Sequence, residues 1–155
     1  MTYRKIIFVS EENIFTSPVA EAVMRRKLSE GGDDETKVTS CGMIVLFPEP
    51  ANPKGIAIAK SRGIDLSEHR AKAASGDMFG EEVLVLVMTE KIKASVYEKY
   101  KNAVNIYTIK EFAGLEGDVE TPYGKGMKEY GEVYTQLEEL VSMVLCKLKS
   151  LEKQG

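Results

Sequence analysis

The sequence has no tryptophan, one histidine (His69) and only two cysteines, Cys41 and Cys146. So few histidine and cysteine residues, without metal-type spacing, exclude a zinc site built on them. We expect both cysteines to be buried free thiols of a protein in a reducing cytoplasm rather than a redox pair. His69 is expected to have a structural role as a hydrogen-bond partner of a loop.

The chain also has no excess of positive charge and no long hydrophobic run. Twenty-one basic residues against 24 acidic ones give a net charge of −3, which argues against a nucleic-acid partner. No apolar run approaches the ~18 residues that a membrane span requires. The N-terminal MTYRKIIFVS contains a short apolar stretch without a signal-peptide cleavage pattern, so we interpret it as a first strand. These absences predict a soluble cytoplasmic protein that binds neither nucleic acid nor membrane.

What is present is the pattern of one α/β domain. A length of 155 residues with 43% hydrophobic residues is typical of one domain, here 1–155. Short apolar runs predict strands near 5–9, 38–41, 83–88 and 104–107. The run VLVLVM is continuously apolar, as in strands of a parallel sheet buried on both faces.

Helical patterns separate these strands. The first opens at Ser17-Pro18, where Ser17 is the predicted N-cap and Pro18 the first helical residue. Further helices are predicted at 54–61, 91–100 and 127–151, whereas 113–126 is too rich in glycine for regular structure. The last helix has a predicted core stripe of Val133, Leu137, Leu140, Val144 and Leu148. The alternation predicts a three-layer α/β sandwich with four parallel strands. Ligands of such folds bind at the carboxyl ends of the strands, here residues 10–17.

The segment IIFVSEENIFTSPVAEAVMRRKL resembles the first strand, loop and helix of the low-molecular-weight protein tyrosine phosphatases. The loop of that family has a cysteine, five residues, an arginine and then Ser-Pro, with asparagine at the fourth position. The resemblance continues in order through Ser40-Cys41-Gly42, Gly63-Ile64-Asp65, His69-Arg70, Met88 and Thr121-Pro122-Tyr123-Gly124 to a long final helix. It implies the phosphotyrosine protein phosphatase I-like, Rossmann-like fold, with strand order 2-1-3-4.

The resemblance also implies where the chemistry would lie. The family uses a thiolate to attack phosphorus, an arginine to clamp the phosphoryl oxygens, small loop residues around the phosphate and an aspartic acid to protonate the leaving group. Asn13, Ser17 and Pro18 match this pattern. The cysteine, glycine, arginine and aspartate positions carry Ser10, Glu12, Thr16 and Thr121.

These replacements predict a catalytically inactive homologue, a pseudophosphatase that acts as a binding or regulatory protein. A serine hydroxyl is not ionised near neutral pH, and loss of a phosphoryl-clamping arginine typically costs about 10³-fold or more in rate. We therefore also expect the loop to bind phosphate poorly. The alternative is a weakly active or altered phosphatase that hydrolyses phosphotyrosine-type monoesters at the same loop.

Four carboxylates, Glu11, Glu12, Asp118 and Glu120, lie on two loops that face each other in the resembled family. They predict an acidic binding site for a basic side chain of a protein partner or for a weakly held Mg²⁺ or Ca²⁺. Solvated loop carboxylates would give the same sequence. We expect Tyr123 and Tyr130 to be partly buried with a solvated hydroxyl, and a role as surface recognition tyrosines is the alternative. We expect no cofactor, no resident metal and a monomer or weak homodimer.

Overall fold

The computed structural model describes residues 2–154 and contains the predicted four-stranded parallel sheet. Its strands are β1 (Lys5–Ser10), β2 (Lys37–Gly42), β3 (Val83–Val87) and β4 (Ile106–Thr108). They are arranged in the order β2-β1-β3-β4, and every pair is parallel. The strand order and the α/β class are confirmed. Because all four strands run the same way, their carboxyl ends meet at one edge of the sheet.

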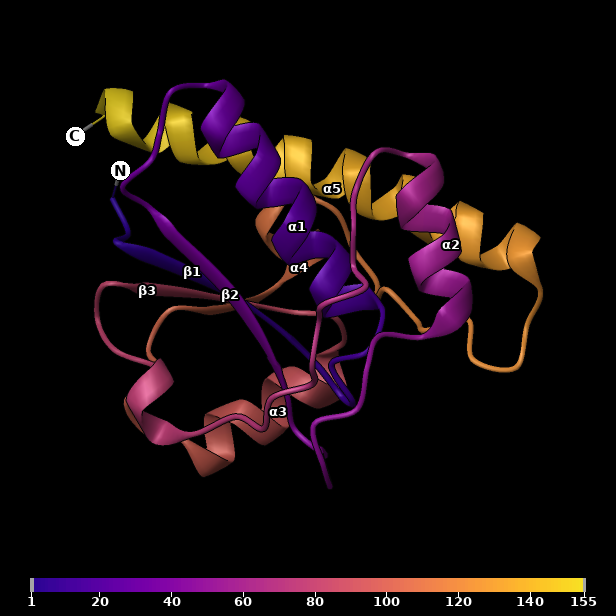
Figure 1. Ribbon diagram of the computed structural model, residues 1–155. Helices are drawn as coiled ribbons and strands as arrows, with labels where there is room; N and C mark the ends of the chain where they lie inside the picture. The colour runs from indigo at the N-terminus through magenta and orange to yellow at the C-terminus, as the bar shows by residue number, and fades with distance from the viewer. Residues whose placement is uncertain (1, 155) are drawn as a thin grey trace.

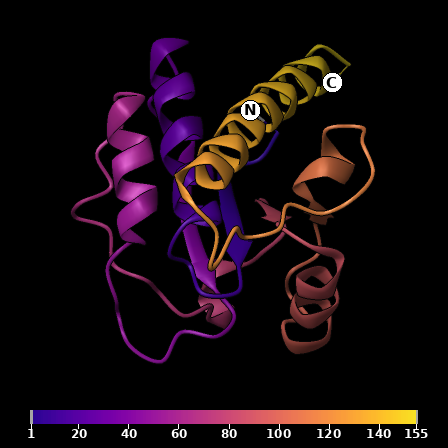
Figure 2. The same cartoon turned by 90° about the vertical axis from the view of Figure 1, so that its right-hand side faces the viewer.

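Helices cover both faces of the sheet, which confirms the three-layer architecture. Figure 1 shows α1 (Thr16–Glu30), α2 (Pro53–Ser61) and α5 (Met127–Gln154) above the sheet and α3 (Glu90–Lys99) below it. Figure 2 gives the perpendicular view of the same layers.

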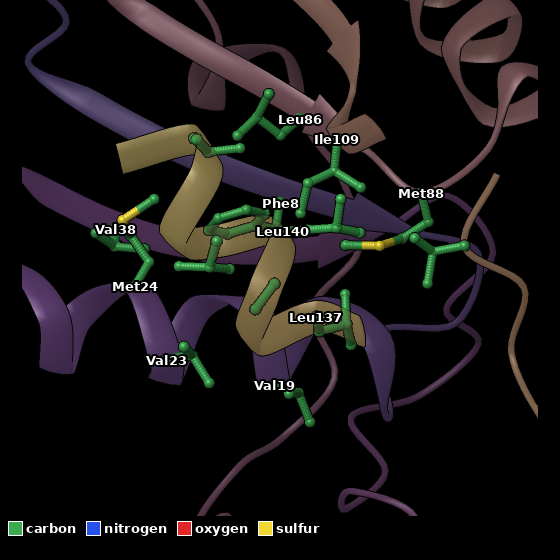
Figure 3. Packing of buried hydrophobic residues seen from close by; sticks show 14 of the residues in the cluster. Phe8, Val19, Val23, Met24, Val38, Leu86, Met88, Ile109, Leu137 and Leu140 are labelled. Atoms are coloured by element: carbon green, nitrogen blue, oxygen red, sulfur yellow. The ribbon is translucent and has the colours of Figure 1, made fainter. Parts of the chain in front are cut away.

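The side chains of the central strand β1 need helices on both faces of the sheet to cover them. Ile6 and Phe8 pack in the core under α1 and α5, whereas Ile7 and Val9 pack in the smaller core that includes Val96 of α3. Successive side chains of a strand point to opposite faces, so a continuous apolar run buries both faces. Figure 3 shows Phe8 of β1 packed with side chains of α1 and α5, including Met24 and Leu140.

The stripe of α5 differs from the prediction at its beginning. Val133 is only partly buried, and the buried stripe begins instead with two tyrosines. Its members are Tyr130, Tyr134, Leu137, Leu140, Val141, Val144 and Leu148.

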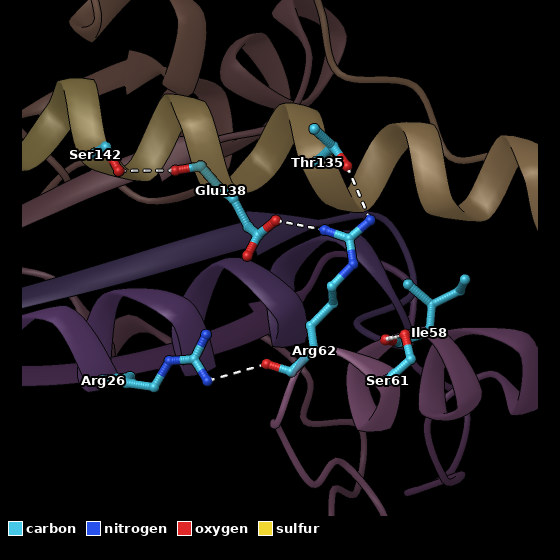
Figure 4. A network of polar contacts seen from close by, with 7 residues as sticks. All are labelled: Arg26, Ile58, Ser61, Arg62, Thr135, Glu138 and Ser142. Atoms are coloured by element: carbon cyan, nitrogen blue, oxygen red, sulfur yellow. Dashed lines mark hydrogen bonds and ion pairs between the residues drawn. The ribbon is translucent and has the colours of Figure 1, made fainter.

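A polar network holds α2 against α5 on the surface (Figure 4). Arg62, at the C-terminus of α2, donates to Glu138 at 2.7 Å and to Thr135 at 3.1 Å. Its guanidinium lies 5.2 Å from the centre of the Tyr134 ring, and its own carbonyl accepts from Arg26 of α1 at 3.1 Å. Arg62 thus connects three helices: its planar guanidinium contacts α5, and its backbone carbonyl contacts α1.

Several boundaries differ from the predictions. The weak strand predicted at 104–107 lies instead at Ile106–Thr108, where pairing with β3 begins, and Val104 is 58% exposed outside it. A short helix, α4 (Ile109–Phe112), was not predicted, although Thr108 and Glu111 form a capping box at its start. The 3₁₀ turn η1 (Gly76–Met78) was also missed. Ser17 is not the N-cap of α1: the helix begins at Thr16 and its N-cap, Phe15, makes no side-chain cap.

Both cysteines are free, but only Cys41 is buried. The prediction that both thiols are buried is wrong for Cys146, which is exposed on α5. Burial in the smaller core raises the pKa of Cys41 to about 12.

The two thiols should therefore differ sharply in reactivity, because the thiolate is the reactive form. Native protein treated with Ellman's reagent at pH 8 is expected to release one equivalent of chromophore quickly, and denatured protein two. Cys146→Ser should abolish the fast phase. Rapid labelling of both thiols in native protein would contradict the burial of Cys41.

Candidate functional site

A cleft of about 800 Å³ lies at the carboxyl edge of the sheet. Its wall is formed by the loop after β1, the start of the loop after β2, part of α3 and the loop before α5. These segments contribute residues 10–16, Met43 and Ile44, 88–89 with parts of α3, and 118–121 with Tyr123. The cleft thus lies where ligands of parallel α/β sheets bind.

The loop after β1 is held in shape by a buried group of hydroxyls and one amide. The Ser10 and Ser17 hydroxyl oxygens lie 2.6 Å apart, and the Asn13 backbone N–H donates to Ser10 at 3.0 Å. The Asn13 side-chain amide donates to Ser17 at 2.8 Å and to Ser40 of β2 at 2.9 Å. Three serines from two segments therefore converge on one asparagine.

Asn13 is also the one non-glycine residue among those described with a positive φ, 59°. Asparagine tolerates this left-handed conformation better than most residues. Its side-chain oxygen accepts the backbone N–H of Lys72 at 3.0 Å, and its carbonyl oxygen lies 2.7 Å from Nε2 of His69. This is the loop contact expected of His69. The interior of the loop is thus fixed from several sides by hydrogen bonds within the chain.

The structure brings Ser10, Thr16 and Thr121 to the same cleft. Ser10 is 6% exposed, and the partners of its hydroxyl are Ser17 and the Asn13 N–H, not a histidine or carboxylate that would serve as a base. Thr16 is 4% exposed at the first position of α1, whereas Thr121 is exposed. Ser17 is fully buried behind the loop and does not line the cleft.

The four predicted carboxylates all line the cleft, but they are not equivalent. Glu11, Glu12 and Glu120 are exposed, and within residues 2–154 none of their side chains has a hydrogen bond or ion pair. Asp118 instead accepts the backbone N–H of Glu90 at 3.0 Å, at the start of α3. The negative charge of Asp118 is stabilised there by the positive N-terminal end of the α3 dipole. Among the described residues, no group of three or more carboxylate, histidine or cysteine side chains is placed to hold a metal ion.

The two candidate tyrosines also differ from each other. Tyr123 is 73% exposed at the rim of the cleft. Tyr130 also lines the cleft, but it is 2% exposed and its ring centre lies 4.7 Å from that of Phe15. The expected partial burial is therefore wrong for both residues, because Tyr123 is more exposed and Tyr130 is more deeply buried. Burial raises the pKa of Tyr130.

Sequence reasoning missed the contribution of α3 and of the loop after β2. Lys91, Glu98 and Lys99 line the cleft from α3, and Met43 and Ile44 line it from the other side. The signal for the second group was present as an uninterrupted apolar run, MIVLFP, directly after Gly42.

No helix in the part of the chain that the structure describes is long and apolar enough to cross a bilayer.

Comparison with known proteins agrees with this geometry. Residues 5–155 match the family model of the low molecular weight phosphotyrosine protein phosphatases. The protein-arginine-phosphatase of Bacillus subtilis is 30% identical over 148 residues, which cover 93% of this chain and 96% of that protein.

Two solved structures are also similar. One is the low molecular weight protein tyrosine phosphatase from T. tengcongensis, with a TM-score of 0.87 and 34% identity over 92% of this chain and 98% of that one. The other is a mutant of the YwlE arginine phosphatase with a phosphorylated active-site serine, with a TM-score of 0.88 and 28% identity over 94% and 95% of the two chains. The chain belongs to the low-molecular-weight phosphotyrosine protein phosphatase family.

Proposed function

We propose that this protein is a member of the family without phosphatase activity, and that it acts by binding a protein partner at the cleft. The observation that carries the proposal is the contrast within one loop. Asn13 and Ser17, which hold its shape, are present and hydrogen-bonded, whereas Ser10, Thr16 and Thr121 stand where the family's nucleophile, clamp and acid would be.

Each replacement removes a different part of the reaction. Ser10 has no adjacent base to ionise its hydroxyl, and an un-ionised hydroxyl is a weak nucleophile. Thr16 lacks the planar pair of donors with which arginine stabilises the transferring phosphoryl group. The Thr121 hydroxyl is too weak an acid to protonate a leaving oxygen in place of a carboxylic acid.

The charge of the cleft supports binding of a cation rather than of a phosphate. Glu11 and Glu12 lie in the loop that would surround the anion, and neither is neutralised by a neighbour. The two carboxylates repel a phosphate. The backbone N–H groups at the start of α1 attract an anion and would have to overcome this repulsion to bind one. We therefore propose that Glu11, Glu12, Asp118 and Glu120 form an acidic binding site, in a monomeric or weakly dimeric cytoplasmic protein.

A second candidate is a slow phosphatase that uses Ser10. One observation favours it: the similar YwlE mutant carries a phosphorylated active-site serine. A serine in this position of that protein therefore accepts a phosphoryl group. In the present chain such a step would transfer the phosphoryl group from an aryl phosphate to the Ser10 oxygen, with the Ser10 proton passing to the released aryl oxygen.

An assay with para-nitrophenyl phosphate separates the two candidates. Wild-type protein is expected to release no nitrophenol above background, with kcat below about 0.1 s⁻¹, at the lower edge of ordinary turnover. Intact mass spectrometry after incubation should show no added phosphoryl group. The Ser10→Ala variant is the matched control and should behave as wild type. Turnover, or a phosphorylated protein, that disappears in Ser10→Ala would establish the second candidate instead.

A further inference from the structure

The loop that follows β2 exposes an unusual amount of apolar surface beside the cleft. Ile44 is 56% exposed, Leu46 90% and Phe47 61%. We call residues 43–47 the apolar rim. In Figures 1 and 2 this loop projects beyond the end of β2, at the lower edge of the molecule. Clustered exposed apolar side chains of this kind mark interaction sites more often than scattered ones do.

The apolar rim is attached directly to the loop after β1. The Met43 N–H donates to the Ser10 carbonyl at 3.1 Å and the Ile44 N–H to the Glu11 carbonyl at 2.8 Å. Gly42 makes this close approach possible, because a Cβ there would lie 2.8 Å from the Glu11 carbonyl oxygen. The rim and the acidic loop therefore form one continuous surface, and a ligand that contacts one lies against the other.

The charge of the cleft selects the kind of group that enters it. Five carboxylates line it, against the two ammonium groups of Lys91 and Lys99. The side chains of four of the five, Glu11, Glu12, Glu98 and Glu120, are unpaired within residues 2–154. A partner that brings a positive charge is therefore attracted, and an acidic partner is repelled.

Thr16 offers a further hydrogen-bonding group in the cleft. Its side chain is 4% exposed and lines the cleft, and its hydroxyl makes no hydrogen bond within the described chain. The neighbouring hydroxyls of Ser10, Ser17 and Ser40 are all paired. The Thr16 hydroxyl can therefore accept a hydrogen bond from a guanidinium or ammonium N–H that enters the cleft.

We propose that the cleft and the apolar rim together bind a segment of a partner protein in which a basic residue is flanked by apolar residues. The basic side chain enters the cleft toward Thr16 and the unpaired carboxylates. The flanking apolar side chains cover Ile44, Leu46 and Phe47. This inference rests on the proposed binding function and adds the chemistry of the partner to it.

The test is a titration of ¹⁵N-labelled protein with the blocked peptide acetyl-Gly-Leu-Arg-Phe-Gly-amide, followed by amide NMR shifts. Amides of 10–17 and 43–47 should move together with a single Kd. Replacing the peptide arginine by citrulline, which has no charge, should weaken binding about three- to fivefold, the upper part of the range for one exposed ion pair. Replacing its leucine and phenylalanine by serine should weaken binding at least about fivefold, because apolar burial is lost.

Variants of the protein should reproduce these losses. Glu11→Gln/Glu12→Gln should weaken binding of the arginine peptide but not of the citrulline peptide, and Leu46→Ser/Phe47→Ser should weaken both. Glu81→Gln and Val104→Ser, at exposed positions beside the opposite ends of the strands, are matched controls and should bind as wild type.

Movement of only one of the two segments, or equal binding of the arginine and citrulline peptides, would overturn the inference. The phosphatase assay is a separate readout. If the peptide does not bind and there is no turnover, the proposed partner chemistry is wrong but the proposed inactivity still holds. If there is turnover that depends on Ser10, the proposed function itself is wrong.

Discussion

Changing Ser10, Thr16 and Thr121 together to Cys, Arg and Asp is expected to raise the hydrolysis of para-nitrophenyl phosphate at least about 10³-fold above wild type, the loss typically caused by removing a phosphoryl clamp alone. The three positions line one cleft around a loop whose internal hydrogen bonds are already formed. The cysteine supplies a nucleophile whose pKa the start of α1 lowers, and the aspartic acid supplies the proton for the leaving group. Release of nitrophenolate at pH 5 to 6 gives kcat and KM.

The matched control keeps serine and changes only Thr16→Arg and Thr121→Asp, which should leave turnover near background because the nucleophile is missing. Adding Glu11→Gln and Glu12→Gln to the triple variant should lower KM, since two negative charges beside the phosphate are removed. If the triple variant folds and still does not hydrolyse the substrate, the loop is not a preserved scaffold, and the loss involves its geometry as well as its side chains.

Asn13→Ala is expected to lower the free energy of unfolding by about 3 kcal/mol, the range for breaking a buried polar network. The side chain makes three hydrogen bonds, to Ser17, Ser40 and the Lys72 N–H, and is fully buried. Alanine also adopts the positive φ of 59° less readily than asparagine. Thermal unfolding followed by circular dichroism should show a Tm lower by about 6 to 12 °C for a chain of this size.

Two further variants separate the causes. Glycine in Asn13→Gly adopts the positive φ without strain but, like alanine, cannot make the three side-chain hydrogen bonds. Most of the loss of unfolding free energy seen in Asn13→Ala should therefore remain. Asn52→Ala removes an asparagine that caps α2 through the N–H groups of Lys54 and Gly55, and should cost about 1 kcal/mol. Wild-type stability in Asn13→Gly would show that the backbone conformation, not the buried network, is what Asn13 provides.

The parts of the fold that were predictable from sequence are those buried on both faces. β1 and β3 consist of unbroken apolar runs, and no other local structure explains such runs between turn residues. The weak strand β4 pairs along only three residues, and its sequence gives no strong period. The start of α1 was misplaced because Ser17-Pro18 satisfies a local capping pattern, whereas tertiary hydrogen bonds to Ser10 and Asn13 use the same hydroxyl.

The candidate site shows the same division. The loop residues 10–17 are contiguous, so their proximity to one another could be predicted once strand and helix were recognised. The contributions of Lys91, Glu98 and Lys99 depend on how α3 packs against the sheet, which no local pattern encodes. Likewise, the sequence places Asp118 and Glu120 two residues apart and cannot distinguish the one bound to the start of α3 from the one left in solvent.

The inward-facing network of Asn13 has a consequence for how such a loop changes over evolution. Shape is specified by groups that point away from the cleft, toward β2 and the Lys72 backbone, and reactivity by groups at its surface. The residues that determine the shape of the loop are therefore largely distinct from those that determine its reactivity. Substitutions at the second set can abolish or change the reaction while the fold of the loop stays intact. Ser10 belongs to both sets, since its hydroxyl lines the cleft and also accepts the Asn13 N–H. A substitution at Ser10 therefore affects both the reaction and the stability of the loop.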